Sequence, residues 1–296
     1  MNPPRVLFLG RSTLDVLYRL DRLPAEDSKV YARDFHAAPG GPALNAAIAH
    51  ALLGGEAMLI SAVGGGPWAA QVRTELDRHQ IQLIDLAHGT AYETPLTTVL
   101  VSADNSSRTI INPPISVVAL PQLVGCWDQA VPADWGTVPP VVLTDGFHLE
   151  ETMPLLAACH AAGAKLCLDG GSWKPGTEEL APLLTAAICS ERFATPGLDV
   201  EAESLFTWFA EKGVPCIALT RGARSILGWE HERRFQIEVE RINATDTLGA
   251  GDVLHGAFAH FFASGMEFEP AIRRASQIAT LSCQSLGTQA WAAQSG

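Results

Sequence analysis

Lysine is scarce in this sequence, with four copies among 296 residues, at positions 29, 165, 174 and 212. None of them follows a loop of the form G-x-x-x-x-G-K-[ST], which excludes a P-loop nucleotide site. The H-R-D and D-F-G pair of protein kinases is also missing. Basic residues number 20 against 32 acidic ones, giving a net charge of −12. This balance argues against a nucleic-acid partner, which needs a basic surface.

Long apolar runs and paired cysteines are lacking too. The longest apolar stretch, 46–63, is interrupted by a histidine, two glycines and a glutamate, so no membrane span is expected. The first ten residues are too short for a signal peptide. The six cysteines contain no C-x-x-C pair, which predicts buried, reduced thiols in a cytoplasmic protein. His255 and His260 are five residues apart, a spacing that does not place two metal ligands on one helix face.

The sequence does contain a regular alternation of strand-like and helical segments. Strands are predicted at 5–10, 57–66, 81–86, 140–146, 164–171, 186–190, 214–220 and 233–242. Helices are predicted at 42–55, 67–79, 151–162, 198–212, 250–264 and 269–285. This order predicts an α/β fold with a mostly parallel central sheet and helices on both faces.

Two regions break this alternation and predict a small β-sheet lid. Residues 11–37 include the strand-like run 29–37, and residues 92–112 resemble a hairpin that turns at ADNSS. The predicted core therefore comprises 1–10, 38–91 and 113–296. Strands exposed on such a lid can pair across a two-fold axis, which predicts a homodimer.

The stretch INATDTLGAGDVLHGAFAHFFASG, residues 242–265, joins a glycine-rich turn to an apolar helix. Free N–H groups at a helix start bind anions, yet Asp252 places a carboxylate there. An acidic residue can simply stabilise the helix start. Alternatively, Asp252 takes a proton from a hydroxyl that attacks a phosphoryl group held by the N–H groups of Gly249, Ala250 and Gly251.

Four segments together resemble the ribokinase-like carbohydrate kinases, also called the PfkB family. DTLGAGD (246–252) resembles the family's D-T-x-G-A-G-D signature, and PGGPALNAAIAHALLGG (39–55) its N-terminal glycine-rich signature. LGRSTLDVLYRLDRLP (9–24) resembles its opening segment, and ALTRGARSILGW (218–229) its nucleotide-side turn. The resemblance covers nearly the whole chain and implies transfer of the γ-phosphoryl group of ATP to a sugar hydroxyl.

The resemblance also implies roles for individual residues. Asp252 would be the general base, and the loop Gly249, Ala250 and Gly251 would stabilise the transferred phosphoryl group. Side chains and backbone expected to bind the sugar are those of Asp15, Gly40, Gly41, Asn45 and Arg108. Residues expected to line the nucleotide site are Thr220, Gly222, Thr247, Gly249 and Gly251. Asp246 would lie beside a monovalent cation, such as potassium.

One departure from the family pattern concerns the metal. Many members carry an Asn-x-x-Glu motif that organises Mg²⁺ through water, and the corresponding AICSERFATPG (187–197) has no Asn. Glu191 is the candidate replacement, and Mg²⁺ is expected to accompany ATP. This absence and the segment SRTII favour the ketohexokinase or sulfofructose-kinase side of the family. A nucleoside kinase of the same fold and a non-catalytic sugar or nucleotide sensor are the alternative functions.

Overall fold

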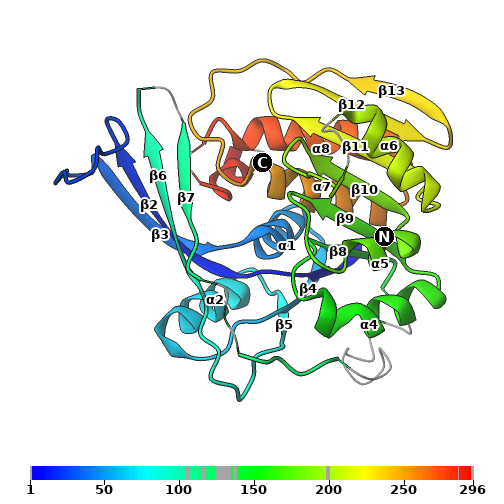
Figure 1. Ribbon diagram of the computed structural model, residues 1–296, viewed down its shortest axis with the longest axis horizontal. Coiled ribbons are helices and arrows are strands. Elements are labelled where there is room, and N and C mark those ends of the chain that lie inside the picture. The colour runs from blue at the N-terminus through cyan, green and yellow to red at the C-terminus, as the bar shows by residue number, and fades with distance from the viewer. Residues whose placement is uncertain are drawn as a thin grey trace.

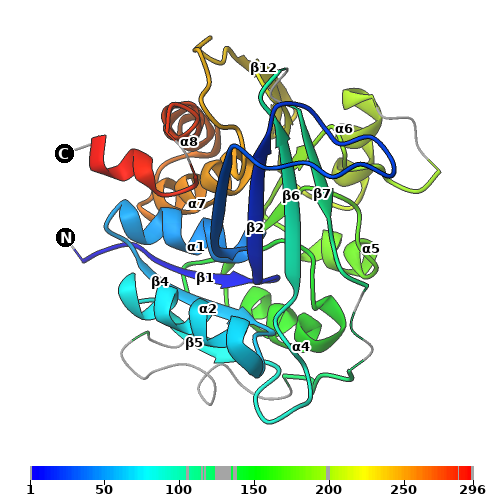
Figure 2. The same ribbon diagram turned by 90° about the vertical axis from the view of Figure 1, so that its left-hand side faces the viewer.

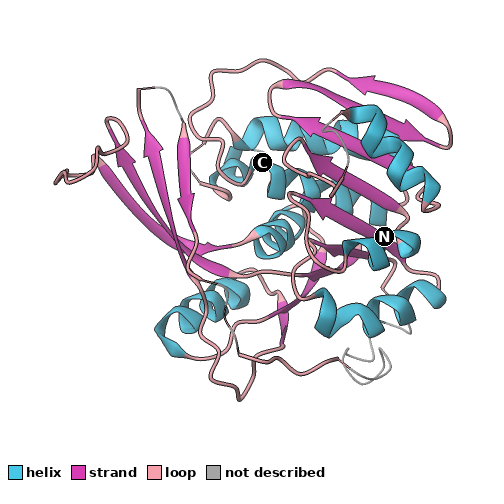
Figure 3. Ribbon diagram, viewed as in Figure 1, coloured by secondary structure: helices cyan, strands magenta, loops and turns pink. Residues whose placement is uncertain are grey.

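The computed structural model of this protein describes residues 2–104, 107–114, 116, 118–123, 135, 139–197, 201–285 and 287–294. Within these residues the chain forms two β-sheets and a set of helices that surround the larger sheet (Figure 3). The predicted α/β class, with a mostly parallel sheet and a separate small sheet, is confirmed.

The large sheet has nine strands in the order β13-β12-β11-β10-β9-β8-β1-β4-β5. Its strands are β1 (Arg5–Leu9), β4 (Glu56–Ser61), β5 (Gln82–Asp85), β8 (Val141–Thr144), β9 (Lys165–Gly170), β10 (Ala186–Ser190), β11 (Cys216–Arg221), β12 (Arg224–Glu230) and β13 (Arg233–Ile237). The pairings from β5 to β11 are parallel, and β12 and β13 add an antiparallel edge. Strand β12 was not predicted, and the strand predicted at 233–242 ends at Ile237.

Helices cover both faces of the large sheet because its strands are apolar on both sides. In β1, Val6 and Phe8 join one buried cluster, and Leu7 and Leu9 join the other. The first cluster includes α1 (Pro42–Leu52), α2 (Gly66–Arg78), α7 (Ala250–Ala263) and α8 (Phe268–Ser282). The second includes α4 (Leu149–Ala161), α5 (Thr177–Leu180), the 3₁₀ turn η2 (Ala181–Leu183) and α6 (Ala202–Glu211). A further 3₁₀ turn, η3 (Ala290–Gln294), follows α8.

The small sheet consists of β2 (Thr13–Leu20), β3 (Asp34–Gly40), β6 (Leu96–Ser102) and β7 (Arg108–Ile111), in the order β3-β2-β6-β7. It stands to one side of the large sheet (Figure 1) and faces the viewer in Figure 2. The predicted hairpin is the pair β6–β7, although Asn105 and Ser106 of its turn lie outside the described residues. The run predicted as a strand from residue 29 becomes a strand only at Asp34.

The remaining sequence expectations concern thiols and membranes. Cys159, Cys167, Cys189 and Cys216 are buried and free, and Cys283 is free and half-buried. Cys126 lies outside the described residues, as do residues 198–200 of the helix predicted at 198–212. Of the helices in the described part of the chain, none has the length and apolar character that crossing a bilayer requires.

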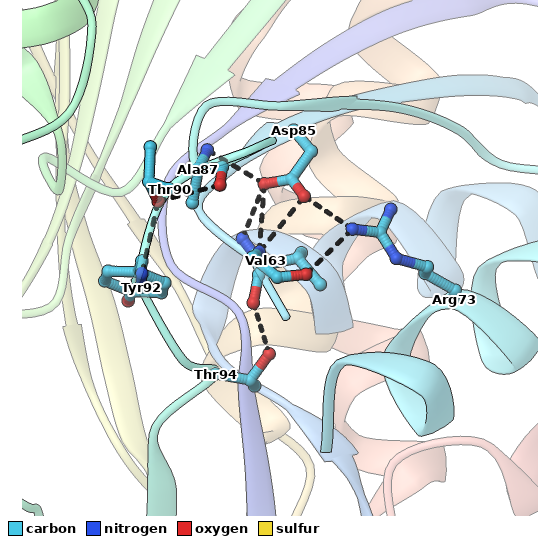
Figure 4. A network of polar contacts seen from close by, with 8 residues as sticks. Val63, Arg73, Asp85, Ala87, Thr90, Tyr92 and Thr94 are labelled. Atoms are coloured by element: carbon cyan, nitrogen blue, oxygen red, sulfur yellow. Dashed lines mark hydrogen bonds and ion pairs between the residues drawn. The ribbon is translucent and has the colours of Figure 1, made fainter. Parts of the chain in front are cut away.

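A buried carboxylate joins the large sheet to the segment that leads into the small one (Figure 4). At the end of β5, Asp85 accepts hydrogen bonds from the backbone N–H groups of Val63, Gly64 and Ala87 and from Arg73 Nη2 at 2.6 Å. Thr94, two residues before β6, donates to the Val63 carbonyl at 2.7 Å. The network therefore fixes the β4–α2 turn and the start of the chain that becomes β6.

Replacing Asp85 with Asn should destabilise the protein by about 1–3 kcal/mol at pH 7, since one acceptor oxygen becomes a donor facing buried donors. Burial raises the pKa of Asp85, but its hydrogen bonds outweigh burial and hold the pKa below 3.8. The wild-type advantage should therefore be present above pH 3.8 and be lost as the pH falls further. Urea denaturation at several pH values measures this difference. Asp77→Asn, an exposed carboxylate on α2, is the matched control, and equal losses in both variants would contradict the role of the network.

Candidate active site

The glycine-rich turn before α7 has the conformation that an anion-binding helix start requires. Gly249 is the N-cap residue, with φ 68° and ψ 5° in the left-handed region that favours glycine. The N–H group of Ala250 makes a long hydrogen bond of 3.4 Å to the Thr247 carbonyl, and the N–H groups of Gly251 and Asp252, in the first turn of α7, have no intrahelical acceptor. The turn therefore presents backbone donors together with the positive end of the helix dipole.

Asp252 lies in the first turn of α7, next to the buried amide of Asn45 on α1. Asn45 Nδ2 donates a hydrogen bond of 2.7 Å to Asp252 Oδ2. Within the described chain no hydrogen bond occupies the other oxygen, Oδ1. Burial, with the nearby charge of Asp169, raises the pKa of Asp252 to about 7, against the opposing effect of the Asn45 hydrogen bond. One oxygen is thus fixed, and the other can accept a proton near neutral pH.

Asp15 and the two predicted glycines meet where the small sheet joins α1. Asp15 on β2 accepts a hydrogen bond of 2.6 Å from Thr13 Oγ1, and burial raises its pKa. Gly40 ends β3 so close to Asp15 that a Cβ there would lie 2.1 Å from Asp15 Oδ2. Gly41, with φ 100°, is the N-cap residue of α1. The glycines allow the backbone to pass beside this carboxylate.

A cleft of about 470 Å³ brings these groups together, within the volume range of small-ligand sites. Of the predicted site residues, those that line it are Asp15, Gly41, Asn45, Arg108, Asp246, Gly249, Gly251 and Asp252. Its described lining does not include Gly40, Thr247, Ala250, Thr220, Gly222 or Glu191. Most residues predicted to bind the sugar therefore lie in one cleft, whereas several residues predicted to bind the nucleotide or the metal lie outside its lining.

Arg108 and Asp246 both hold the glycine-rich turn. Arg108, on β7 of the small sheet, donates from Nη1 to the Thr247 carbonyl at 2.7 Å. Asp246 accepts from the N–H of Leu248 at 2.8 Å and from the N–H of Gly287 at 3.0 Å. Both oxygens of Asp246 are thus used by backbone donors, and Arg108 connects the small sheet directly to the turn.

The predicted nucleotide and metal residues lie on and after β10 and β11. Thr220 donates to the Cys189 carbonyl at 3.2 Å, and Gly222 lies in the β11–β12 turn with φ 63°. Both oxygens of Glu191 accept hydrogen bonds from Arg224. Across the described residues, no group of three or more His, Cys, Asp and Glu side chains is arranged to hold a metal ion. In the described part of the chain, Glu191 is thus paired with Arg224 and is not grouped with other possible metal ligands.

His255 and Asp169 form a buried pair behind Asp252 that the sequence did not predict. His255 Nδ1 lies 2.7 Å from the Gly251 carbonyl and 3.3 Å from Asp169 Oδ2, and Nε2 lies 3.1 Å from the Ile188 carbonyl. The ring therefore connects the first turn of α7 with β10 and lies beside the Asp169 carboxylate. The sequence signal that could have identified Asp169 is an acidic residue next to the end of an apolar strand, KLCLDG.

Asp145 is a second buried carboxylate that the sequence did not single out. It follows β8 and accepts from the N–H groups of Arg11 at 2.9 Å, Ala43 at 3.1 Å and Phe147 at 2.9 Å. Burial raises its pKa to about 7. Arg11 and Lys174, also unpredicted, line the same cleft. Asp145 therefore fixes three backbone segments at the carboxyl ends of the parallel strands, where α/β folds bind ligands.

Comparison with known proteins agrees with this geometry. The family model described as pfkB family carbohydrate kinase matches residues 4–294. The chain belongs to the pfkB family of carbohydrate kinases. A ribokinase of Lactococcus lactis is 24% identical over 292 residues, covering 96% of this kinase and 92% of the relative.

Solved structures show the same fold along nearly the whole chain. One protein from Agrobacterium tumefaciens, known from a crystal structure, is 26% identical in sequence to this kinase. The alignment covers 98% of this kinase and 94% of that chain, with a TM-score of 0.82. The ribokinase of Arabidopsis thaliana, solved with ribose and ATP, is 21% identical and covers 97% and 94%, with a TM-score of 0.75. The predicted family and the phosphotransferase class, with an alcohol group as acceptor, are confirmed.

Gly249→Ala should destabilise this kinase by about 1–2 kcal/mol, the cost of a left-handed conformation for a residue with a Cβ. The added Cβ would also lie 2.3 Å from Thr288 Cγ2. Gly251→Ala is the matched control, because Gly251 is helical and its Cβ would meet no atom within 4 Å. Urea denaturation compares the two variants. Equal stability of Gly249→Ala and Gly251→Ala would contradict the strained turn.

Proposed function

We propose that this kinase transfers the γ-phosphoryl group of ATP to a sugar hydroxyl, with Asp252 as the general base. The observation that carries the proposal is the Asn45–Asp252 hydrogen bond at the start of α7. Asn45 orients the carboxylate, and its other oxygen accepts the hydroxyl proton. The hydroxyl oxygen then bonds to the γ-phosphorus as the bond to the β-phosphate oxygen breaks and ADP leaves. The N–H groups of the 249–252 turn stabilise the negative charge on the phosphoryl oxygens.

The acceptor would bind between the two sheets. In this proposal Asp15 and Asn45 bind sugar hydroxyls, since a carboxylate accepts and an amide both donates and accepts. Gly40 and Gly41 bring backbone close to the sugar. Arg108 reaches the acceptor or the phosphates from β7 once it leaves the Thr247 carbonyl. That the sugar is of the kind used by ketohexokinases or sulfofructose kinases stays a prediction.

The nucleotide would extend from the start of α7 toward the β11–β12 turn. Thr220, Gly222 and Thr247 are proposed to contact it. Mg²⁺ keeps several waters and is commonly carried by substrate phosphates. Among the described residues, no group of three or more His, Cys, Asp and Glu side chains is arranged to hold it, and Glu191 must leave Arg224 to take part. A potassium ion beside Asp246 would likewise compete with two backbone donors. No step of the proposed transfer is therefore assigned to a bound cation.

We also propose that the small sheet acts as a lid and pairs two copies of the chain. Arg108 supports the lid, because it reaches from β7 to the catalytic turn. Exposed apolar side chains support the dimer, among them Phe35, Ile110 and Ile111 on the edge strands β3 and β7, 43–56% exposed. Sedimentation showing only a 31.5 kDa species would contradict the dimer.

Turnover against a panel of sugars tests the function itself. Ketoses, pentoses and nucleosides would be offered with ATP, and release of ADP measured. We expect turnover with a sugar. Preferred turnover of a nucleoside would favour the nucleoside-kinase alternative. Binding of ATP and sugars without any turnover would favour a sensor that has kept the fold.

Asp252→Asn should reduce kcat by about 10²- to 10⁴-fold, the usual contribution of a general base. The amide oxygen of the new Asn can still accept a hydrogen bond from Asn45 once the side chain turns, but the amide cannot take the proton. Sugar binding should therefore weaken far less than kcat falls. Calorimetry with the sugar and a non-hydrolysable ATP analogue measures the binding. Asp77→Asn is again the charge control. Wild-type turnover by Asp252→Asn would exclude the base assignment.

The pH dependence should reflect the raised pKa of Asp252. A base acts only when ionised, so kcat/KM should fall as the pH drops below about 7. Removing the Asp169 charge makes the Asp252 carboxylate easier to ionise. The acid limb of kcat/KM should therefore move to lower pH in Asp169→Asn. An acid limb at the same pH in both proteins would contradict this electrostatic coupling.

A further inference from the structure

Two basic side chains in the cleft lie against the same aromatic ring. Arg11 Cζ is 5.1 Å and Lys174 Nζ is 4.5 Å from the centroid of the Phe147 ring. Both residues line the cleft that contains Asp252 and Asp15. Arg11 follows β1 and Lys174 follows β9, so the fold brings two cations from distant segments to one place.

The positions of these cations are fixed by the surrounding backbone. Asp145 accepts from the backbone N–H groups of both Arg11 and Phe147, at 2.9 Å each. A Cβ on Gly146 would lie 3.1 Å from Lys174 Cγ, so the lysine stem packs directly on this turn. Lys174 Nζ also donates to the Ser172 carbonyl at 2.9 Å and to Ser172 Oγ at 2.6 Å. The two charges are therefore held near the ring by defined contacts.

Neither cation is neutralised by an ion pair within the described residues. The contacts of Lys174 are to uncharged oxygens, and the guanidinium of Arg11 makes no hydrogen bond there. The nearby carboxylates are used otherwise, since Asp145 accepts from backbone donors and Asp169 contacts His255. Burial lowers the pKa of Lys174, and the positive charge of Arg11 lowers it further, against Asp145 and Asp169. Two like charges with unused donors thus face one cavity.

These cations lie beside the start of α1, where the sugar is proposed to bind. A Cβ on Gly41, the N-cap residue of α1, would lie 2.4 Å from the Arg11 carbonyl oxygen. Asp145 accepts from the N–H groups of both Arg11 and Ala43, and Lys174 packs on the turn that follows Asp145. The phosphates of ATP are proposed to lie at the start of α7, so they do not account for this pair. A ligand group at the acceptor end of the cleft does.

We propose that the acceptor is an anionic sugar, whose carboxylate, phosphate or sulfonate group is bound by Arg11 and Lys174. A planar guanidinium pairs two of its N–H groups with two oxygens of such a group, and a lysine adds a point charge beside it. Phe147 supports both cations and covers one side of the site. The inference rests on the proposed sugar kinase function and names the class of its acceptor.

The test compares sugars of one carbon skeleton that differ in one terminal group: the neutral sugar, the sugar acid, the sugar phosphate and the sulfonated sugar. ADP release gives kcat/KM for each. One anionic sugar should exceed its neutral counterpart by about 100-fold or more, the effect of two charge-assisted hydrogen bonds. The best of the three anionic sugars identifies the chemistry of the group.

Variants assign that preference to the two cations. Arg11→Met and Lys174→Met should each lower the ratio of anionic to neutral kcat/KM by about 10- to 100-fold. Lys174→Arg, which keeps the charge, should retain more of the ratio than Lys174→Met. Lys165→Met removes an exposed lysine at the other end of β9 and should leave the ratio as in wild type.

Several outcomes would overturn the inference. If neutral sugars are phosphorylated as well as anionic ones, the sugar kinase function stands and the anionic acceptor does not. The same holds if Arg11→Met and Lys174→Met raise the KM for ATP and leave the ratio unchanged. If no sugar of either kind is phosphorylated, the proposed function itself fails.

Discussion

The close packing of α7 on α1 determines where the reactive groups of this kinase meet. A Cβ on Gly256 of α7 would lie 2.2 Å from the Ala46 carbonyl of α1, so the two helices touch backbone to backbone. One turn earlier in α7 and one residue earlier in α1, the same contact places Asp252 against Asn45. The carboxylate at the helix start is therefore positioned by the core rather than by the glycine-rich turn alone. The parallel sheet then supplies the other groups, because its strands end at the same edge.

Collecting acidic groups at this edge has an energetic cost. Burial raises the pKa of both Asp145 and Asp252 to about 7. Each is thus harder to ionise in the folded protein than in the unfolded chain. Because of these two groups, the free energy of unfolding should decrease as the pH rises from about 4 to about 7. The backbone donors around Asp145 and the His255 ring beside Asp169 offset part of this cost.

The sequence allowed the fold class and the local part of the site to be predicted. Asp252, Gly249, Asn45 and Gly41 belong to short motifs whose backbone geometry follows from neighbouring residues, and the structure brings all four to one cleft. Asp145 and Asp169 are single acidic residues at strand ends, and their neighbours depend on the strand order β9-β8-β1, which local patterns do not contain. Partners far along the chain are equally hidden, as with Glu191 and Arg224. Strand β12 was missed because RSILGWE does not alternate between polar and apolar residues.

The hydrogen bond from Arg108 to the Thr247 carbonyl has a consequence for how ligands affect one another. It is a charged contact between the small sheet and the turn that begins α7. Any ligand that draws Arg108 away, or moves the small sheet, changes the free energy of that turn. By thermodynamic reciprocity, a ligand that binds the turn must change the affinity of the small sheet for its own ligand by the same factor. The two substrates of this kinase would then bind with a coupling free energy even without touching each other.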